Sequence, residues 1–481
     1  MNHLATTDNN LGISLSALAC TDENAAEVYK DLSNVANLPL KELCAKNPSL
    51  IVFPKILGQA RDGIEEEKIF EMAGSFENPQ NAKITTGNLM GFLGVGNTQL
   101  KISSRFTKDD KQDFFLYYML QKIFSINLFD YKYTTSLKCE LDLLLFLFPY
   151  FLKKALAQGM YRQYQTFEKN DANVKGVIDV NRHIRQNIPF AGRIAYNSRE
   201  RSFDNSVTQL IRHTIETIKT TPFGNTLLTR DSEVKNCIQE IVAATDSYTV
   251  RNREKVIARN LKPISHPYYT AYKPLQKLCL SILQHRKNGY GNSKNKVYGI
   301  LFDGAWLWEE YLATILTSCG FSHPKNKSGT GGISVYNGNP RYPDFYFGKQ
   351  IPKNSNHKVL EQAANENFVL DAKYKHLDNH ISNSDEIKGC FSRDDLHQLI
   401  TYMYIMPANR AGLIYPYDKA DKRDEAKIIE SKPKELFGYG GKIRTYGMPI
   451  PVTRTYAEFQ HSMCEIENKL VYMMKNTKCQ D

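Results

Sequence analysis

The sequence predicts a mixed α/β protein with several domains. Its 481 residues exceed what one ordinary hydrophobic core accommodates, so two or three domains are expected. Hydrophobic residues make up 42% and charged residues 23% of the chain, which is typical of a soluble globular protein. Strand-like runs stand between helical runs, and the last third carries the order helix, three strands, helix, strand.

Three domains are expected along the chain. A β-rich N-terminal domain covers residues 1–130, a basic and mostly helical middle domain covers 131–296, and a third domain covers 297–481. The polar, glycine-bearing stretch 289–296 separates the second domain from the third.

The sequence predicts a cytoplasmic protein without a membrane span. The chain does not open on a basic segment followed by an apolar one, so no signal peptide is expected. The longest apolar run, 141–152, contains Asp142 and Pro149 and is too short to cross a bilayer, so a buried helix is expected there. The nine cysteines form no C-x-x-C pair, as expected of reduced thiols and not of a zinc ribbon.

Residues 51–106 have a β-like pattern. Within them, residues 91–98 (G-F-L-G-V-G-N-T) come close to a phosphate-binding loop, but Asn97 stands where the phosphate-binding lysine should be. A hairpin with Gly96 and Asn97 at its turn explains the same residues better. Residues 1–50 carry no recognisable chemistry, although 24–37 could form a helix.

The middle of the chain carries the positive charge. The net charge is +11, and residues 151–300 alone hold 25 Lys and Arg against 11 Asp and Glu. Basic residues and tyrosines alternate in the first part of this region, a combination that suits a phosphate backbone. The candidate DNA-binding residues are Arg162, Lys175, Arg182, Arg185 and Arg193, among Tyr161, Tyr164 and Tyr196. The alternative is a basic helix-and-hairpin surface that binds nothing. Helices are expected to follow at 205–220, 231–244 and 272–286.

Residues 367–375 (N-F-V-L-D-A-K-Y-K) are predicted to form a strand with one buried face. Because side chains alternate along a strand, Asp371 and Lys373 lie on the same face. A carboxylate and an ammonium so placed can hold a divalent cation and position a water. Acid-x-Lys recurs in the chain, for example at Glu66 and Lys68, and most such pairs are ordinary salt pairs. Whether Asp371 and Lys373 form a functional site therefore depends on the residues that the neighbouring elements bring near them.

Those neighbours carry further polar residues. A helix is expected from residue 306 to Gly320 and contains Glu309 and Glu310. Asp344 stands before an aromatic strand, and a polar loop (348–367) leads from that strand to the next. A helix is predicted from Ser392 to Pro407, and a strand at 411–417 follows. Asp394, Gln398 and Tyr402 lie on one face of that helix.

This pattern resembles the PD-(D/E)xK nuclease superfamily, whose core is helix-β-β-β-helix-β. Pro343-Asp344 matches the first half of the motif, and Asp371-Ala-Lys373 matches the second. Glu309 matches an acidic residue of the first helix, and Gln398-x-x-x-Tyr402 matches a motif of some branches. The resemblance implies catalysis by Asp344, Asp371, Lys373, Glu309, Gln398 and Tyr402.

A narrower resemblance covers most of the chain. The segments G-M-Y-R-Q-Y, V-K-G-V-I-D-V, W-E-E-Y-L, P-D-F, L-D-A-K-Y-K and D-L-H-Q-L-I-T-Y, in this order, are similar to the McrC family. These are the nuclease subunits of McrBC modification-dependent restriction systems. The resemblance implies a hexameric AAA+ GTPase partner, McrB, whose GTP hydrolysis the subunit stimulates, and cleavage of modified double-stranded DNA. It also implies that residues 1–130 dock in the GTPase ring.

The predicted chemistry is phosphodiester hydrolysis with Mg²⁺, or with Mn²⁺ as the alternative ion. Asp344, Asp371 and Glu309 are expected to bind the metal, with the Ala372 carbonyl as a further ligand. Lys373 is expected to orient or deprotonate the attacking water. Glu310 is the alternative to Glu309, because only one of two consecutive residues can face the site.

Gln398 and Tyr402 are expected to hold the water, the metal ligands or a phosphate. The alternative is that they form part of a partly exposed helix face. Asp394 and Asp395 are interpreted as acids favoured at a helix N-terminus. A zinc site at His376 and His380 is the weakest alternative.

Two other functions fit the sequence. The chain could be a stand-alone nuclease of DNA repair or recombination. It could also be a non-catalytic adaptor that activates a GTPase or bridges it to DNA. Cleavage without a partner would favour the first, and cleavage unaffected by Asp371→Ala would favour the second.

Overall fold

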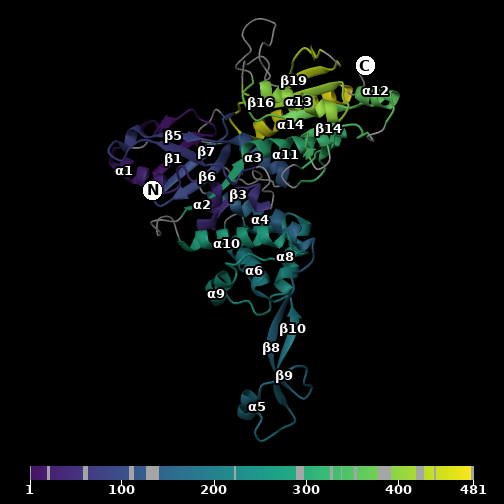
Figure 1. The fold of residues 1–481 in the computed structure, drawn as a ribbon. Coiled ribbons are helices and arrows are strands. Elements are labelled where there is room, and N and C mark those ends of the chain that lie inside the picture. Colours follow the sequence, from purple (N-terminus) through teal and green to yellow (C-terminus); the bar gives the residue numbers. More distant parts are fainter. Residues whose placement is uncertain are drawn as a thin grey trace. The chain divides into compact units, whose positions relative to one another are not determined.

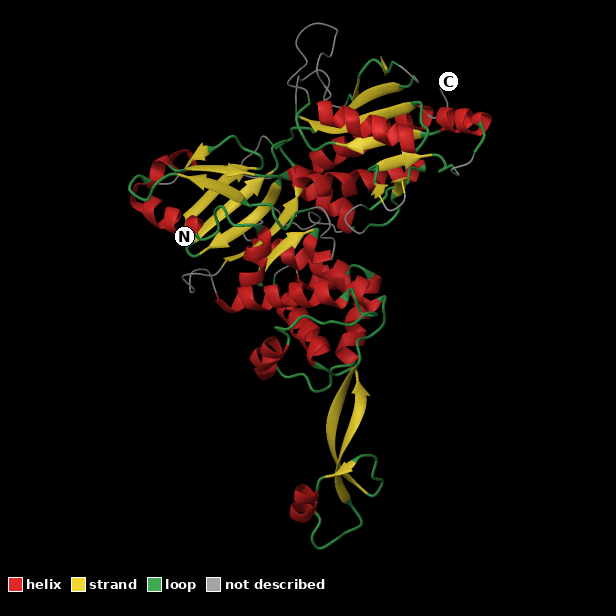
Figure 2. Ribbon diagram, viewed as in Figure 1, coloured by secondary structure: helices red, strands yellow, loops and turns green. Residues whose placement is uncertain are grey.

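The structure is a computed structural model of the whole chain. It describes residues 2–18, 22–57, 63–107, 113–125, 140–221, 224–288, 297–325, 329–336, 339–351, 355–377, 392–418, 427–437 and 440–477. The chain forms two compact units, Met1–Thr134 with Tyr290–Asp481, and Thr135–Gly289. The expected domain boundaries at 130 and 296 lie outside the described residues, so the three-domain division stays a prediction. The mixed α/β class is confirmed (Figures 1 and 2).

The first unit contains an N-terminal five-stranded sheet. Its strands in spatial order are β1 (Asn2–Thr7), β7 (Thr98–Ser103), β6 (Leu89–Val95), β11 (Val297–Asp303) and β3 (Leu50–Phe53). β6 and β7 are antiparallel and joined through Gly96, whose φ of +58° favours glycine. The predicted hairpin is therefore confirmed. β11 pairs with both β6 and β3, so residues near 300 complete a sheet that the N-terminal residues begin.

Smaller elements surround this sheet. A three-stranded sheet and three helices belong to the N-terminal part: β2 (Ile13–Ser14), β5 (Lys83–Thr86), β4 (Phe70–Ala73), α1 (Asp22–Ser33), α2 (Leu40–Lys46) and α3 (Phe114–Phe124). Asp113 caps α3 by accepting the N–H of Leu116, and most side chains of this helix are buried. α3 packs against α11 (Gly304–Leu316), the helix that follows β11 directly.

The C-terminal part of the first unit contains a second sheet. Its strands in spatial order are β14 (Phe345–Phe347), β15 (Phe368–Ala372), β16 (Arg410–Tyr417), β19 (Lys442–Pro449) and β17 (Ile429–Glu430), and β18 (Lys434–Glu435) also pairs with β19. β15, β16 and β19 are parallel, whereas β14 and β17 run antiparallel to their neighbours. The other elements here are β12 (Ile333–Tyr336), β13 (Asn339–Arg341), α12 (His357–Glu366), α13 (Arg393–Ile405) and α14 (Tyr456–Thr477).

Two predictions for this sheet need correction. All five residues of β15 are buried, and not one face only, because β15 is an inner strand with α13 and α11 both packed against it. The expected polar loop 348–367 contains α12, which Asn356 caps by accepting the N–H of Val359. The helices predicted to begin near residues 306 and 392 are confirmed as α11 and α13. Gly320, with a φ of +83°, ends the 3-10 turn Thr317–Cys319 that follows α11.

The second unit combines helices with a three-stranded sheet. Its elements are α4 (Glu140–Leu156), β8 (Gln163–Asp171), β9 (Val177–Ile178), α5 (Val180–Gln186), β10 (Ile194–Ser202), α6 (Ser206–Lys219), α7 (Gly224–Thr229), α8 (Ser232–Ala243), α9 (Arg253–Arg259) and α10 (Tyr272–Asn288). α4 continues through Pro149 as one helix. β8 and β10 form a long antiparallel ribbon that extends from the helices of this unit, with β9 and α5 at its far end (Figure 1).

His213 lies on α6 inside the second unit. Its side chain has no exposure, its ring centre lies 4.7 Å from that of Tyr248, and neither ring nitrogen has a hydrogen-bond partner in the described part of the chain. Burial, together with the positive charges of Arg253 and Arg212, lowers the pKa of His213 to about 4. The native state therefore contains the neutral ring at neutral pH.

This histidine predicts a loss of stability in acid. The unfolded chain takes up the proton near pH 6.5 and the folded chain only near pH 4, so stability falls as the pH falls between these values. The slope approaches about 1.4 kcal/mol per pH unit. His213→Leu should reduce this slope in urea unfolding at pH 7, 6 and 5, whereas His461→Leu, at an exposed histidine, should not. Equal slopes in wild type and His213→Leu would contradict the prediction.

Candidate active site

Asp371 lies near the end of β15, an inner strand of the C-terminal sheet, and its side chain has no exposure. Its Oδ2 forms an ion pair with Nζ of Lys373 at 2.6 Å. Apart from this contact with Lys373, neither carboxylate oxygen accepts a hydrogen bond from the described residues. Burial raises the pKa of Asp371, and the charge of Lys373 partly opposes this effect. The same electrostatic attraction raises the pKa of Lys373 although burial alone would lower it.

Asp344 reaches the end of β15 from the segment before β14. Its Oδ2 accepts the backbone N–H of Ala372 at 2.7 Å. Its carbonyl oxygen accepts a hydrogen bond from Nδ1 of His323 at 2.7 Å. Burial raises the pKa of Asp344 well above its usual range, and the charges of Asp371 and Glu309 raise it further. The structure therefore brings Asp344, Asp371 and Glu309 into one electrostatic neighbourhood.

The two consecutive glutamates of α11 have different surroundings. Glu309 acts electrostatically on Asp344 and on the hydroxyl of Tyr402. Glu310 instead faces Nε2 of His323 and Nζ of Lys325, each at 3.9 Å. Burial alone would raise the pKa of Glu310, but His323 and Lys325 lower it overall. This geometry favours Glu309 over Glu310 as the third acid of the site.

α13 supplies the other side of the site. Nζ of Lys373 donates to Oε1 of Gln398 at 2.8 Å, and Nε2 of Gln398 donates to the hydroxyl of Tyr402 at 2.8 Å. Because residues four apart lie on one helix face, the lysine, amide and phenol form a chain. Gln398 is partly buried and Tyr402 is 6% exposed, and burial raises the pKa of Tyr402.

Three further residues lie near the site but were not predicted to be site residues. Asp395, interpreted as a helix N-terminal acid, completes a capping box with Ser392 and also pairs with Lys375 and, at 3.7 Å, with Lys373. Burial alone would raise the pKa of Asp395, but Lys375 and Ser392 lower it overall. Lys375 lies two residues beyond Lys373, so strand alternation was the available signal. His323 had no signal, because it lies 21 residues before Asp344.

The residues proposed for DNA binding differ in their accessibility. Arg162, Lys175, Arg185 and Arg193 are exposed on or beside the β8–β10 ribbon. Arg182 is largely buried within the unit: its Nη2 donates to the carbonyl of Tyr196 at 2.6 Å, and its Nη1 pairs with Glu168 at 2.7 Å. Tyr196 is also buried, at 1% exposure. Arg182 and Tyr196 therefore stabilise the ribbon itself.

The donor set of the site fits a hard divalent cation. Asp344, Asp371 and Glu309 offer carboxylate oxygens, and apart from its contact with Lys373 the buried Asp371 accepts no hydrogen bond from the described residues. No group of three His, Cys, Asp or Glu in the described ranges is gathered at metal-coordinating spacing. Two carboxylates are enough for Mg²⁺, which completes its shell with water and phosphate oxygens. The zinc alternative at His376 and His380 is not tested, because His380 lies outside the described residues.

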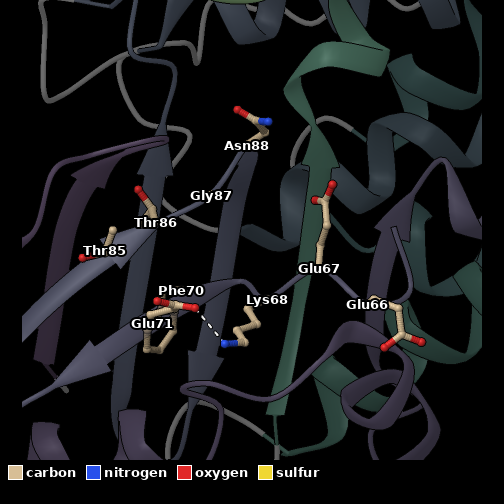
Figure 3. A pocket seen from close by; sticks show the side chains of 9 residues that line it. All are labelled: Glu66, Glu67, Lys68, Phe70, Glu71, Thr85, Thr86, Gly87 and Asn88. Atoms are coloured by element: carbon tan, nitrogen blue, oxygen red, sulfur yellow. Dashed lines mark hydrogen bonds and ion pairs between the residues drawn. The ribbon is translucent and has the colours of Figure 1, made fainter. Parts of the chain in front are cut away.

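A surface pocket of about 370 Å³ lies elsewhere in the first unit. Figure 3 shows its lining, in which Lys68 and Glu71 form an ion pair at 2.7 Å. The lining residues are Glu66, Glu67, Lys68, Phe70, Glu71, Thr85, Thr86, Gly87 and Asn88. None of them is a predicted site residue, and the acid-x-Lys pair among them is solvated. This pocket is therefore separate from the residues predicted to form the site.

A family model described as McrBC 5-methylcytosine restriction system component matches residues 84–416, about two thirds of the chain. The chain belongs to this family. The match begins in β5 and ends in β16. The McrBC family region therefore includes the second unit together with Asp344, Asp371 and α13.

Two solved structures resemble this McrBC component. The first is the refined half-complex from a tetradecameric assembly of Thermococcus gammatolerans McrB AAA+ hexamers with bound McrC. It is 16% identical, with 97% of this chain and 100% of that chain covered and a TM-score of 0.48. The second is the cryo-EM structure of the Thermococcus gammatolerans McrBC complex, 15% identical over 66% of this chain and 88% of that chain, with a TM-score of 0.33. Likenesses this distant carry no conclusion about partners. Curated protein sequences yield no match.

Within the described ranges, none of the helices combines the length and the apolar character that crossing a bilayer requires.

The buried carboxylates that lie close together in the site predict that a bound metal ion raises the thermal stability of the protein. Asp344→Asn removes one of the buried negative charges while it keeps an acceptor for the Ala372 N–H, so the melting temperature in EDTA should rise by at least about 2 °C. Millimolar Mg²⁺ or Mn²⁺ should raise the melting temperature of the wild type and of the control Asp394→Asn, but not that of Asp344→Asn. Wild-type protein that responds to neither ion would contradict metal binding.

Proposed function

We propose that the chain is the DNA-cleaving subunit of a McrBC-type, 5-methylcytosine-directed restriction system. The observation that carries the proposal is the arrangement at the end of β15. Asp344 accepts the Ala372 N–H, and the ammonium of Lys373 lies 2.6 Å from the buried carboxylate of Asp371. The elements α11, β14, β15, α13 and β16 would then form a PD-(D/E)xK-like nuclease core.

The proposed reaction is hydrolysis of a DNA phosphodiester. When bound, Mg²⁺ or Mn²⁺ would polarise the phosphate and lower the pKa of a water. Asp344 and Asp371 would hold the ion, and Glu309 and the Ala372 carbonyl are further candidate ligands. Lys373 would orient the water and offset the negative charge that builds up on the phosphate. Gln398 keeps the lysine ammonium aligned through a 2.8 Å hydrogen bond, and Tyr402 orients the amide of Gln398.

Family membership supports a McrB-like AAA+ GTPase hexamer as the partner, with stimulated GTP hydrolysis. Residues 1–130 stay the predicted docking part. Double-stranded DNA, carrying modified bases, is the proposed substrate, and the cytoplasm is the proposed location. The exposed Arg162, Lys175, Arg185 and Arg193 are the proposed phosphate contacts, whereas Arg182 is left out because its guanidinium is used inside the second unit.

The decisive experiment is plasmid cleavage with Mg²⁺. Methylated and unmethylated DNA are compared, with and without GTP and a McrB-like GTPase from the same source. Wild type should cut methylated DNA only with GTP and partner, and Lys373→Ala should lower the rate roughly 100-fold or more. Lys68→Ala, from a solvated acid-x-Lys pair, is the matched control and should retain activity.

The other outcomes separate the alternatives. Cleavage by the chain alone, without GTP, would indicate an independent nuclease of DNA repair or recombination. Cleavage that is equal in wild type and Lys373→Ala would assign the reaction to another subunit and leave this chain as an adaptor.

The consecutive glutamates give a second prediction. Glu309→Gln should lower the cleavage rate at least about tenfold, because it removes a charge beside the metal ligands. Glu310→Gln, on the same helix, should have a clearly smaller effect, since Glu310 faces His323 and Lys325. The reverse order of the two effects would assign the third acid to Glu310. The rates are compared at saturating Mg²⁺ in the reconstituted complex.

A further inference from the structure

Tyr374 directly follows Lys373, just beyond the end of β15, and its side chain points away from that of Lys373. Lys373 faces Asp371 and α13, whereas Tyr374 is 7% exposed and points into the N-terminal part of the same unit. Its hydroxyl lies 2.8 Å from Oγ of Ser104, directly after β7. The ring packs edge-on against Phe106 with 5.1 Å between centres, and the guanidinium of Arg105 lies 4.8 Å over it.

Arg105, which lies over the Tyr374 ring, is itself held in place by several hydrogen bonds. Asp8, which has no exposure, accepts the backbone N–H of Arg105 at 2.6 Å. Its other oxygen accepts from Nε and Nη2 of the same arginine, at 2.9 and 2.6 Å. Asn88 also accepts from this guanidinium at 2.6 Å. The planar guanidinium of Arg105, bound by both Asp8 and Asn88, is a rigid support. A lysine at this position would not provide it.

The first residue of α11, Gly304, contacts this same group of residues. The N–H of Gly304 donates to the carbonyl of Asn88 at 2.8 Å. A Cβ on Gly304 would lie 2.6 Å from Cε1 of Tyr374, so only glycine allows the ring to approach so closely. The helix that carries Glu309 and the strand end that carries Lys373 therefore rest on one group of N-terminal residues.

We propose that Ser104 and Arg105 act through Tyr374 as positioning residues for Lys373. The backbone N–H of Lys373 donates to the carbonyl of Ile414 at 2.9 Å, which fixes the chain on the side of the sheet. Tyr374 fixes it on the other side. Between these two restraints the side chain of Lys373 reaches Asp371 and Gln398. The inference rests on the proposed nuclease function, and it makes the N-terminal sheet part of the support of the cleavage site.

The test uses Tyr374→Phe, Ser104→Ala and the double variant in the reconstituted complex. Each single variant should lower kcat roughly tenfold while KM for DNA stays the same, because small displacements of a catalytic group cost rate and not binding. The double variant should be no slower than the slower single variant, since both remove the same hydrogen bond. Arg105→Lys should behave like the single variants.

Tyr118→Phe is the matched control. Tyr118 is equally buried, and its hydroxyl donates to Glu467 at 2.8 Å, away from Lys373. Its loss should lower thermal stability by a similar amount and change kcat by no more than about twofold. Equal kcat values in Tyr374→Phe, Ser104→Ala and Tyr118→Phe would overturn the proposal.

Amide hydrogen exchange gives a measurement that does not depend on cleavage. The peptide containing the Lys373 amide should exchange at least about threefold faster in Tyr374→Phe and Ser104→Ala than in wild type or Tyr118→Phe. If the wild-type complex cleaves no DNA, the proposed function fails, while this exchange pattern would still support the positioning role. Unchanged exchange would overturn it. If Tyr374→Phe does not fold, Ser104→Ala and Arg105→Lys decide.

Discussion

The burial of Asp371 is the constraint on which the C-terminal sheet depends. A carboxylate removed from water costs several kcal/mol unless a cation or hydrogen bonds compensate. Lys373 provides that cation at 2.6 Å and is itself held by Gln398 and Asp395 on α13. β15, the residues directly after it and α13 must therefore keep their relative positions. A small shift would leave a charge without its counter-charge inside the protein.

This arrangement gives up local stability. Burial raises the pKa of both Asp344 and Asp371, so the folded protein holds carboxylates that would prefer a proton or an additional cation. Close packing of aromatic side chains around α11 compensates for the cost of burying these carboxylates. Trp308 is completely buried on α11, and the hydroxyl of Tyr311, on the same helix, donates to Glu467 of α14 at 2.8 Å. Close aromatic packing around α11 thus stabilises the helix that carries Glu309.

Local patterns could predict much of the neighbourhood of the site. Strand alternation placed Lys373 beside Asp371, and the spacing of four brought Gln398 next to Tyr402 on a helix that Ser392 caps. Their catalytic roles stay predictions. Partners distant in sequence could not be found in this way. The hydrogen bond from His323 to Asp344 and the pairing of β11 with β3 depend on the tertiary fold and leave no local pattern.

The pairing of β11 with β3 also determines when the protein can fold. Gly299 stands opposite Leu50, so the two strands are 249 residues apart in the chain. Contacts this distant in sequence form slowly, and during synthesis they cannot form until the second strand has left the ribosome. The whole of Thr135–Gly289 is made in the interval. The second unit can therefore fold first, and β6 and β3 stay without the strand that lies between them until nearly two thirds of the chain has been translated.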